Sequence, residues 1–329
     1  PEPRGEDLAR ALEVNAYLHT MAGNTEVVPG LVERTLEVGG PGLDETVVIR
    51  SLNHRGTAAN LRAYPAGRDS LEEAQARAEA AGQWYEAARA LVMQAWAAIE
   101  YRDLSAASEF SGRAMEMAAS HEIQALETGA RAQRARVLEL TGSWDEAADI
   151  CRDLDGAATI TRMVVLPVLG VIEARRGRPS AAALLAESWA MASQANEYQR
   201  LSTSASALAE HAWITGRWEV ETARLRAVLD LGLKRGRLWP TGLLAYWLWE
   251  LGQLSEVPAE VAEPYRYIFE GRAAAAAELL DRRGMPYERA LALMHGSDAQ
   301  RLEALEVLET MGATAVAAKL RKSLREQGI

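Results

Sequence analysis

The stretch TGSWDEAADI (residues 141–150) ends one helix-like segment with a glycine and opens the next with a tryptophan and small residues. Three other stretches share this form: YRDLSAASEF (101–110), RGRPSAAALL (176–185) and TGRWEVETAR (215–224). Their break positions are Gly142, Gly177 and Gly216, with Arg102 in place of glycine, and lie 35 to 40 residues apart. That spacing is typical of helical repeat proteins with two helices in each unit.

Elementary helix chemistry explains the form of these breaks. Glycine can adopt the left-handed conformation that ends a helix. Ser143 is a candidate N-cap and Pro179 a candidate first-turn residue of the next helix. One helical pair cannot bury its apolar face alone, so the pairs must stack. We therefore predict an all-α fold of tetratricopeptide-like helical hairpins stacked into a right-handed superhelix, an α-solenoid.

The whole chain, residues 1–329, is predicted to form a single superhelical domain. The stretch ETVVIRS (45–51) is the nearest candidate for a strand and fits the start of a helix equally well. The stretch GGPGLDE (39–45) is interpreted as a turn between repeats. The approximate repeats are 6–38, 44–81, 83–120, 122–155, 158–196, 198–236, 239–270 and 272–296, with a closing hairpin at 299–327.

Composition limits the classes of partner. The formal net charge of −10 argues against contact of this segment with nucleic acid or an anionic membrane. The longest uncharged stretch, residues 238–249, is too short to span a bilayer. The single cysteine, Cys151, excludes an internal disulfide framework and suits a reducing cytosol, so we expect a cytoplasmic protein. The opening PEPRGED lacks Met, and we expect a piece cut from a longer protein.

Motifs for nucleotide binding, metalloprotease chemistry and nucleophilic hydrolysis are missing from the sequence. The five histidines are scattered without metal-ligand spacing. We therefore expect no catalytic residue, no metal and no cofactor. An all-helical enzyme is an alternative that would require a buried acid–base pair with strongly shifted pKa values in a deep pocket.

Polar residues inside the otherwise apolar first helices of the repeats are candidates for a binding groove. Arginines at the same depth in successive repeats would make a positive groove for a carboxylate, a phosphate or an acidic peptide. Alternatively, these arginines pair with neighbouring glutamates and only complete the surface. The candidates are Asn53, Arg55, Asn60, Arg89, Gln94, Arg131, Arg134, Arg162 and Arg200.

Tryptophans form a second set of candidates. Trp144 and Trp218 follow a break glycine at the same repeat position and are interpreted as wedges between helices. The segment LWPTGLLAYWLWELG (238–252) is denser, and its rings cannot all face one direction on a helix. Some of them must then line a surface or groove, where a ligand or partner is one possible contact. The candidates there are Trp239, Tyr246 and Trp249.

The last quarter of the chain resembles a known family. Residues 262–328, which contain GMPYERALAL (284–293), resemble the closing repeats of large ATP-binding regulators of the LuxR family. The stretches LAYWLWELG (244–252) and GRDSLEEAQARAEAAG (67–82) also look like that family, and the resemblance is loosest before about residue 45. Met285 stands at the position where that family usually has cysteine. The motif GMPYERALAL itself indicates a turn between two packed helices, because Gly284 ends one helix and Pro286 begins the next.

The resemblance implies a role without catalysis. In such regulators a nucleotide-binding module of the STAND type precedes the repeats and a LuxR helix-turn-helix follows them. The repeats would then sense a small-molecule inducer or a protein in their concave groove, and contact the regulator's own ATPase and DNA-binding modules. Neither nucleic acid nor a membrane is an expected partner of this segment. The alternative is a general peptide- or protein-binding adaptor that has no link to transcription.

Overall fold

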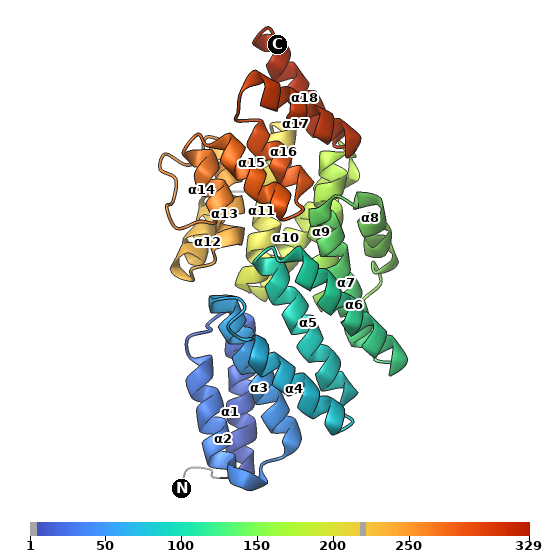
Figure 1. The fold of residues 1–329 in the computed structure, drawn as a ribbon, viewed down its shortest axis with the longest axis vertical. Coiled ribbons are helices and arrows are strands. Elements are labelled where there is room, and N and C mark those ends of the chain that lie inside the picture. Colours follow the sequence, from blue (N-terminus) through green and yellow to red (C-terminus); the bar gives the residue numbers. More distant parts are fainter. Residues whose placement is uncertain (1–4, 218–221) are drawn as a thin grey trace. The chain divides into compact units, whose positions relative to one another are not determined.

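The computed structural model describes residues 5–217 and 222–329, and every regular element within these ranges is helical (Figure 1). The all-α prediction is confirmed. Residues 40–42 form a short 3-10 turn, η1 (Gly40–Gly42), as expected for the stretch GGPGLDE. The α-helices are α1 (Glu6–Ala22), α2 (Val28–Gly39), α3 (Glu45–Arg62), α4 (Arg68–Ala80), α5 (Trp84–Glu100), α6 (Leu104–Ser120), α7 (Gln124–Thr141), α8 (Trp144–Asp153), α9 (Thr159–Arg175), α10 (Ser180–Ala195), α11 (Tyr198–Thr215), α12 (Thr222–Lys234), α13 (Leu238–Glu250), α14 (Glu263–Phe269), α15 (Ala273–Arg282), α16 (Pro286–Leu293), α17 (Asp298–Thr310) and α18 (Thr314–Glu326).

The residues between paired helices adopt the left-handed conformation that the break pattern requires. The φ angle is +90° at Gly142 and +58° at Arg102, which occupies the position of a missing glycine. A side chain at positive φ is strained, and burial and bonding must compensate for it. Arg102 is buried, and its guanidinium donates to the carbonyl oxygen of Ile99 at 2.6 Å. Trp218, the expected wedge after Gly216, lies outside the described residues.

Two helix starts differ in detail from the expectation. Ser143 occupies the N-cap position of α8, but its hydroxyl makes no capping hydrogen bond. Pro179 is the N-cap of α10, one residue before the first turn in which we expected it. The stretch ETVVIRS begins helix α3, and the side chain of Asp44 caps that helix by accepting from the N–H of Thr46 at 2.7 Å.

The chain divides into two compact units, Pro1–Arg134 and Ala135–Ile329. In the first unit α1, α3 and α5 pack side by side, and each also packs against the helix that follows it. Alanines that are fully buried, including Ala74, Ala78 and Ala87, let these helices approach closely. The closest approach is at Gly67, where an added Cβ would lie 1.8 Å from the carbonyl oxygen of Gly56.

In the second unit α9, α11 and α13 form the corresponding row, and α18 packs on α9 and α11. The phrase GMPYERALAL links α15 to α16 as predicted: Gly284 has a φ of +68° and Pro286 begins α16. Tyr287 and Leu291 are buried. Trp144 is buried with its indole N–H donating to the carbonyl oxygen of Glu139 at 3.0 Å, so its interpretation as a wedge is confirmed.

Candidate functional site

Seven side chains from α1, α3 and α5 meet in the first unit, and we call them the A-helix cluster. They comprise two glutamates, two arginines, one histidine and two partly exposed tyrosines. Each member contacts or electrostatically influences another member across the helix row. The cluster consists of Glu13, Tyr17, Arg50, His54, Tyr85, Glu86 and Arg89.

In the A-helix cluster a buried negative charge lies beneath positive charges that are closer to the solvent. The Nε atom of Arg50 donates to the Glu86 carboxylate at 2.6 Å, and Arg89 lies 3.6 Å from the other oxygen of that carboxylate. The Glu86 side chain is only 4% exposed, whereas that of Arg50 is 41% exposed. The negative charge therefore lies beneath the surface, and the charge that faces solvent is positive.

The A-helix cluster also contains a buried histidine–glutamate pair. The Nε2 atom of His54 lies 2.7 Å from Glu13 Oε1, and both side chains are buried. Burial lowers the pKa of His54, and the charge of Arg89 lowers it further, while the hydrogen bond to Glu13 opposes both. At neutral pH the imidazole is thus uncharged and can donate its Nε2 proton to the carboxylate. The pair fixes the position of α1 against α3.

Aromatic rings border the arginines of the A-helix cluster. The guanidinium of Arg89 lies 5.2 Å from the centroid of the Tyr17 ring, within cation–π range. Tyr17 is 39% exposed and Tyr85 is 47% exposed, and Val14 and Leu18 extend the exposed apolar surface along α1. Tyrosine and arginine are enriched among the residues that contribute most of the binding energy in protein interfaces.

Of the residues predicted for the first unit, only Arg89 belongs to the A-helix cluster. Asn53 and Gln94 are buried, and Asn60 is buried with its side chain accepting from the N–H of Gly67 at 2.7 Å. Arg55 contacts Ser70 at 3.1 Å and Glu73 at 3.9 Å on α4. On α7, Arg131 is partly buried, and Arg134 donates to Ser108 at 2.6 Å.

The arginines predicted for the second unit pair with acids close by. Arg162 lies 2.6 Å from Glu187, and Arg200 lies 3.7 Å from Glu197. These two, like Arg55, fit the alternative in which arginines pair with neighbouring glutamates. Within each unit, the structure therefore does not give a row of unpaired guanidinium groups at the predicted arginines.

The tryptophan-rich segment is mostly internal. Trp239, Tyr246 and Trp247 are buried, and Trp239 packs edge-on against Tyr265 at 6.0 Å between ring centroids. Trp249 is partly buried between Phe269 and His295. These rings therefore serve the packing of α13 against its neighbours.

One end of this segment joins a histidine and a glutamate. Tyr246 Oη lies 3.2 Å from His295 Nε2, and Glu250 Oε1 lies 3.6 Å from the same nitrogen. Burial lowers the pKa of His295 to about 4 and raises the pKa of Glu250. His295 and Glu250 are thus a buried acid and base with shifted pKa values, the kind of pair that the enzyme alternative requires. However, Nε2 already faces Tyr246 and Glu250, so that nitrogen is not placed to exchange a proton with a substrate.

A buried ion network in the second unit was not predicted from the sequence. Arg175 donates to Glu139 at 2.5 Å and to both oxygens of Glu210 at 2.7 and 3.1 Å. Its guanidinium also lies 3.8 Å from the centroid of the Tyr287 ring. The network joins α7, α9, α11 and α16 and leaves its charged groups out of contact with solvent, so it fixes helix positions and offers no ligand site.

Among the described residues, no group of three or more histidine, cysteine, aspartate or glutamate side chains could hold a metal ion. Within the same ranges, no helix is both long enough and apolar enough to cross a membrane. The chain matches no protein-family model and no curated protein. The resemblance to the LuxR-family regulators stays a prediction, and the A-helix cluster is the strongest candidate site.

Proposed function

We propose that this chain is a non-catalytic binding scaffold that holds a partner segment on the A-helix cluster of its first unit. The observation that carries the proposal is the layering of Arg50 over Glu86. A partly exposed guanidinium is anchored from below by a buried carboxylate, the neighbouring Arg89 lies against the Tyr17 ring, and Tyr85 acts electrostatically on Arg50. An anchored side chain loses less conformational entropy on binding than a free one.

The chemistry of the cluster favours an acidic partner. Among the described residues, Arg50 uses its Nε atom for Glu86 and keeps its two terminal nitrogens for another acceptor. A carboxylate suits such a pair of donors because it can accept from both at once. Tyr17, beside Arg89, and Tyr85 would then contact apolar atoms near that carboxylate. The proposed partner segment carries an aspartate or glutamate flanked by apolar side chains.

The setting of this scaffold is a second part of the proposal. The resemblance of residues 262–328 supports a sensing domain of a bacterial, cytoplasmic, LuxR-family ATP-dependent transcriptional regulator. In that setting the partner is an inducer protein, a small inducer or the regulator's own ATPase module, and ligand binding shifts the balance between two arrangements of the repeats. The alternative is a general adaptor for acidic peptides.

Calorimetric titration separates these settings. In the regulator setting the full-length protein carries ATPase and DNA-binding modules; these are produced separately and titrated into this chain, and ATP is titrated in a parallel experiment. The regulator setting predicts that the ATPase module binds, that binding weakens in Tyr85→Ala, and that ATP binding to this chain is undetectable. Binding of acidic peptides without binding of the module would favour the adaptor. Binding of neither would contradict the scaffold proposal.

A further inference from the structure

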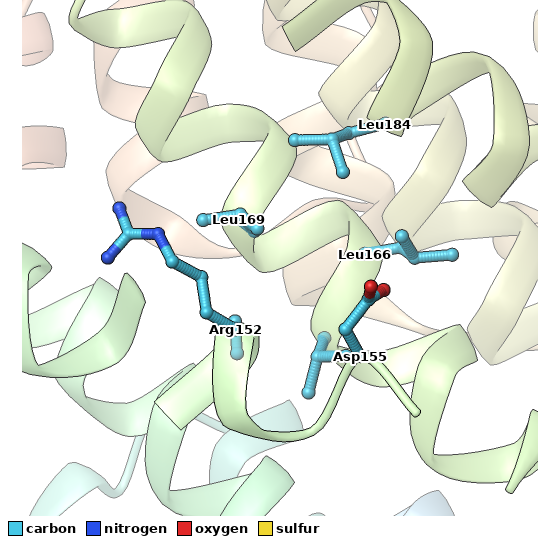
Figure 2. Close-up of a pocket in the computed structure, with 7 residues that line it drawn as sticks. Arg152, Asp155, Leu166, Leu169 and Leu184 are labelled. Atoms are coloured by element: carbon cyan, nitrogen blue, oxygen red, sulfur yellow. The ribbon is translucent and has the colours of Figure 1, made fainter. Parts of the chain in front are cut away.

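A cavity of about 170 Å³ lies in the second unit between α8, α9 and α10 (Figure 2). It is independent of the A-helix cluster, because all of its lining residues belong to the second unit. Its lining residues come from the end of α8, the turn after it, the middle of α9 and the start of α10. They are Cys151, Arg152, Asp155, Val165, Leu166, Leu169 and Leu184.

Most of the cavity lining is apolar. Four of the lining side chains are aliphatic, and the fifth uncharged one is the thiol of Cys151. Burial raises the pKa of Cys151 to about 12, so the thiol stays protonated at neutral pH. A protonated, buried thiol behaves as a small apolar group. These five side chains offer no group that would stabilise a charged or strongly polar ligand.

Each of the two charged residues at the cavity lies near opposite charges of the protein. Arg152 lies 2.7 Å from Asp149 and 3.8 Å from Glu173. Asp155 lies 3.8 Å from Arg162. In Figure 2 the guanidinium of Arg152 points away from Leu166 and Leu184. Because the lining carries one positive and one negative charge, it favours neither an anion nor a cation, and its aliphatic side chains favour a neutral occupant.

The sequence supplies a local reason for the space beside α9. Pro167 lies inside the helix, between lining residues Leu166 and Leu169. Proline lacks an N–H and its ring displaces the preceding turn, so Pro167 removes the helical hydrogen bond to the carbonyl of Met163 and favours a kink. A kink there would make α9 pack less evenly against its neighbours and leave volume between them.

We propose that this cavity is a binding site for a neutral molecule with one aromatic ring, or for a neutral ligand that presents such a ring. An engineered apolar cavity of about 150 Å³ binds benzene, and that volume is close to the volume found here. The ring would contact the leucine and valine side chains and the Cys151 thiol. Because the cavity is partly open to solvent, a small neutral substituent on the ring could extend out of it.

Spectra of the chain with labelled leucine and valine methyl groups test this site, with toluene, benzyl alcohol and benzoate as the probes. Toluene and benzyl alcohol should shift the methyl signals of Val165, Leu166, Leu169 and Leu184. Benzoate, which has the same ring and a negative charge, should bind at least about tenfold more weakly. Shifts confined to other methyl groups, or equal binding of benzoate, would overturn the proposal.

Filling the cavity gives a second, independent readout. Leu184→Trp should weaken toluene binding at least about tenfold, because the indole occupies the space of the ligand ring. The matched control is Leu302→Trp, which adds the same volume at an exposed position on α17 and should leave toluene binding unchanged. If Leu184→Trp does not fold, Leu169→Phe replaces it. Unchanged affinity in a folded cavity-filling variant would contradict the proposal, and so would the absence of toluene binding to the wild type.

Discussion

The hydroxyl of Tyr287 donates a hydrogen bond to Glu210 Oε1 at 2.6 Å, although 77 residues separate them in the sequence. Glu210 is the same carboxylate that accepts two hydrogen bonds from Arg175. The tyrosine of the phrase GMPYERALAL thus completes a buried ion network that α7, α9 and α11 build. This contact explains why a packing motif near the end of the chain carries a polar group.

Removing the Tyr287 hydroxyl should destabilise the second unit. Tyr287→Phe leaves Glu210 with one donor fewer in a buried site, and a hydrogen bond to a charged group contributes about 1.5–3 kcal/mol. Urea denaturation followed by circular dichroism measures the change in the free energy of unfolding. The control is Tyr267→Phe, which removes an exposed hydroxyl–carboxylate contact to Glu263 and should have little effect. Equal effects of the two variants would contradict the role given to Tyr287.

Replacing Arg175 should cost more than any single hydrogen bond. Arg175→Met would leave Glu139 and Glu210 buried with their main cation gone, and breaking a buried ion pair in this way costs about 3–5 kcal/mol. Thermal and urea denaturation measure the loss. Arg282→Met is the matched control because its ion pair with Glu278 is exposed. A loss no larger than in the control would show that the network does not hold these helices.

The position after α6 offers a stabilising substitution. Glu122 is exposed and has a φ of +56°, a conformation that strains any residue with a Cβ. Glu122→Gly should raise the free energy of unfolding by about 0.5–1 kcal/mol, since relief of this strain outweighs the added freedom of the unfolded chain. Glu116→Gly, at an exposed position inside α6, should instead lower it by about 1 kcal/mol. Changes of the same sign in both variants would contradict the conformational argument.

Acid should destabilise the first unit through His54. Its pKa is lowered by burial in the folded chain, so the unfolded chain binds the proton more readily. Stability should therefore be fully present above the ordinary histidine pKa of 6.5 and fall as the pH drops below it toward the lowered value of the folded state. Urea midpoints between pH 8 and 5 measure this slope. In His54→Gln, which keeps a donor for Glu13, the slope should be shallower, and an unchanged slope would exclude this role of His54.

The helical pattern could be predicted from sequence because helix ends impose local demands. A chain that must adopt a positive φ uses glycine, so Gly142 and Gly284 mark their turns directly. Arg102 is an exception: it has a positive φ without being glycine, and its burial and its hydrogen bond compensate for the strain. These signals depend only on residues within one or two turns of the break.

The candidate site could not be predicted in the same way. Periodicity shows which face of a helix is apolar, but it does not show which polar residues of other helices will meet there. Arg50 and Glu86 lie 36 residues apart, and nothing in either local sequence marks their contact. The local sequence around His54, between the candidates Asn53 and Arg55, gives no sign of its partner, because Glu13 lies 41 residues away.

The most direct test of the scaffold proposal is the affinity of acidic peptides for the A-helix cluster. Twelve-residue peptides are selected against the wild-type chain by display, and their affinities for variants are measured by calorimetry. We predict that the selected peptides carry a carboxylate flanked by apolar residues. Their affinity should fall at least about tenfold in both Arg50→Ala and Tyr85→Ala, and should be unchanged in the control Arg34→Ala, whose exposed ion pair lies on α2. Selected peptides without acidic residues, or equal affinity for the wild type and both cluster variants, would contradict the proposal.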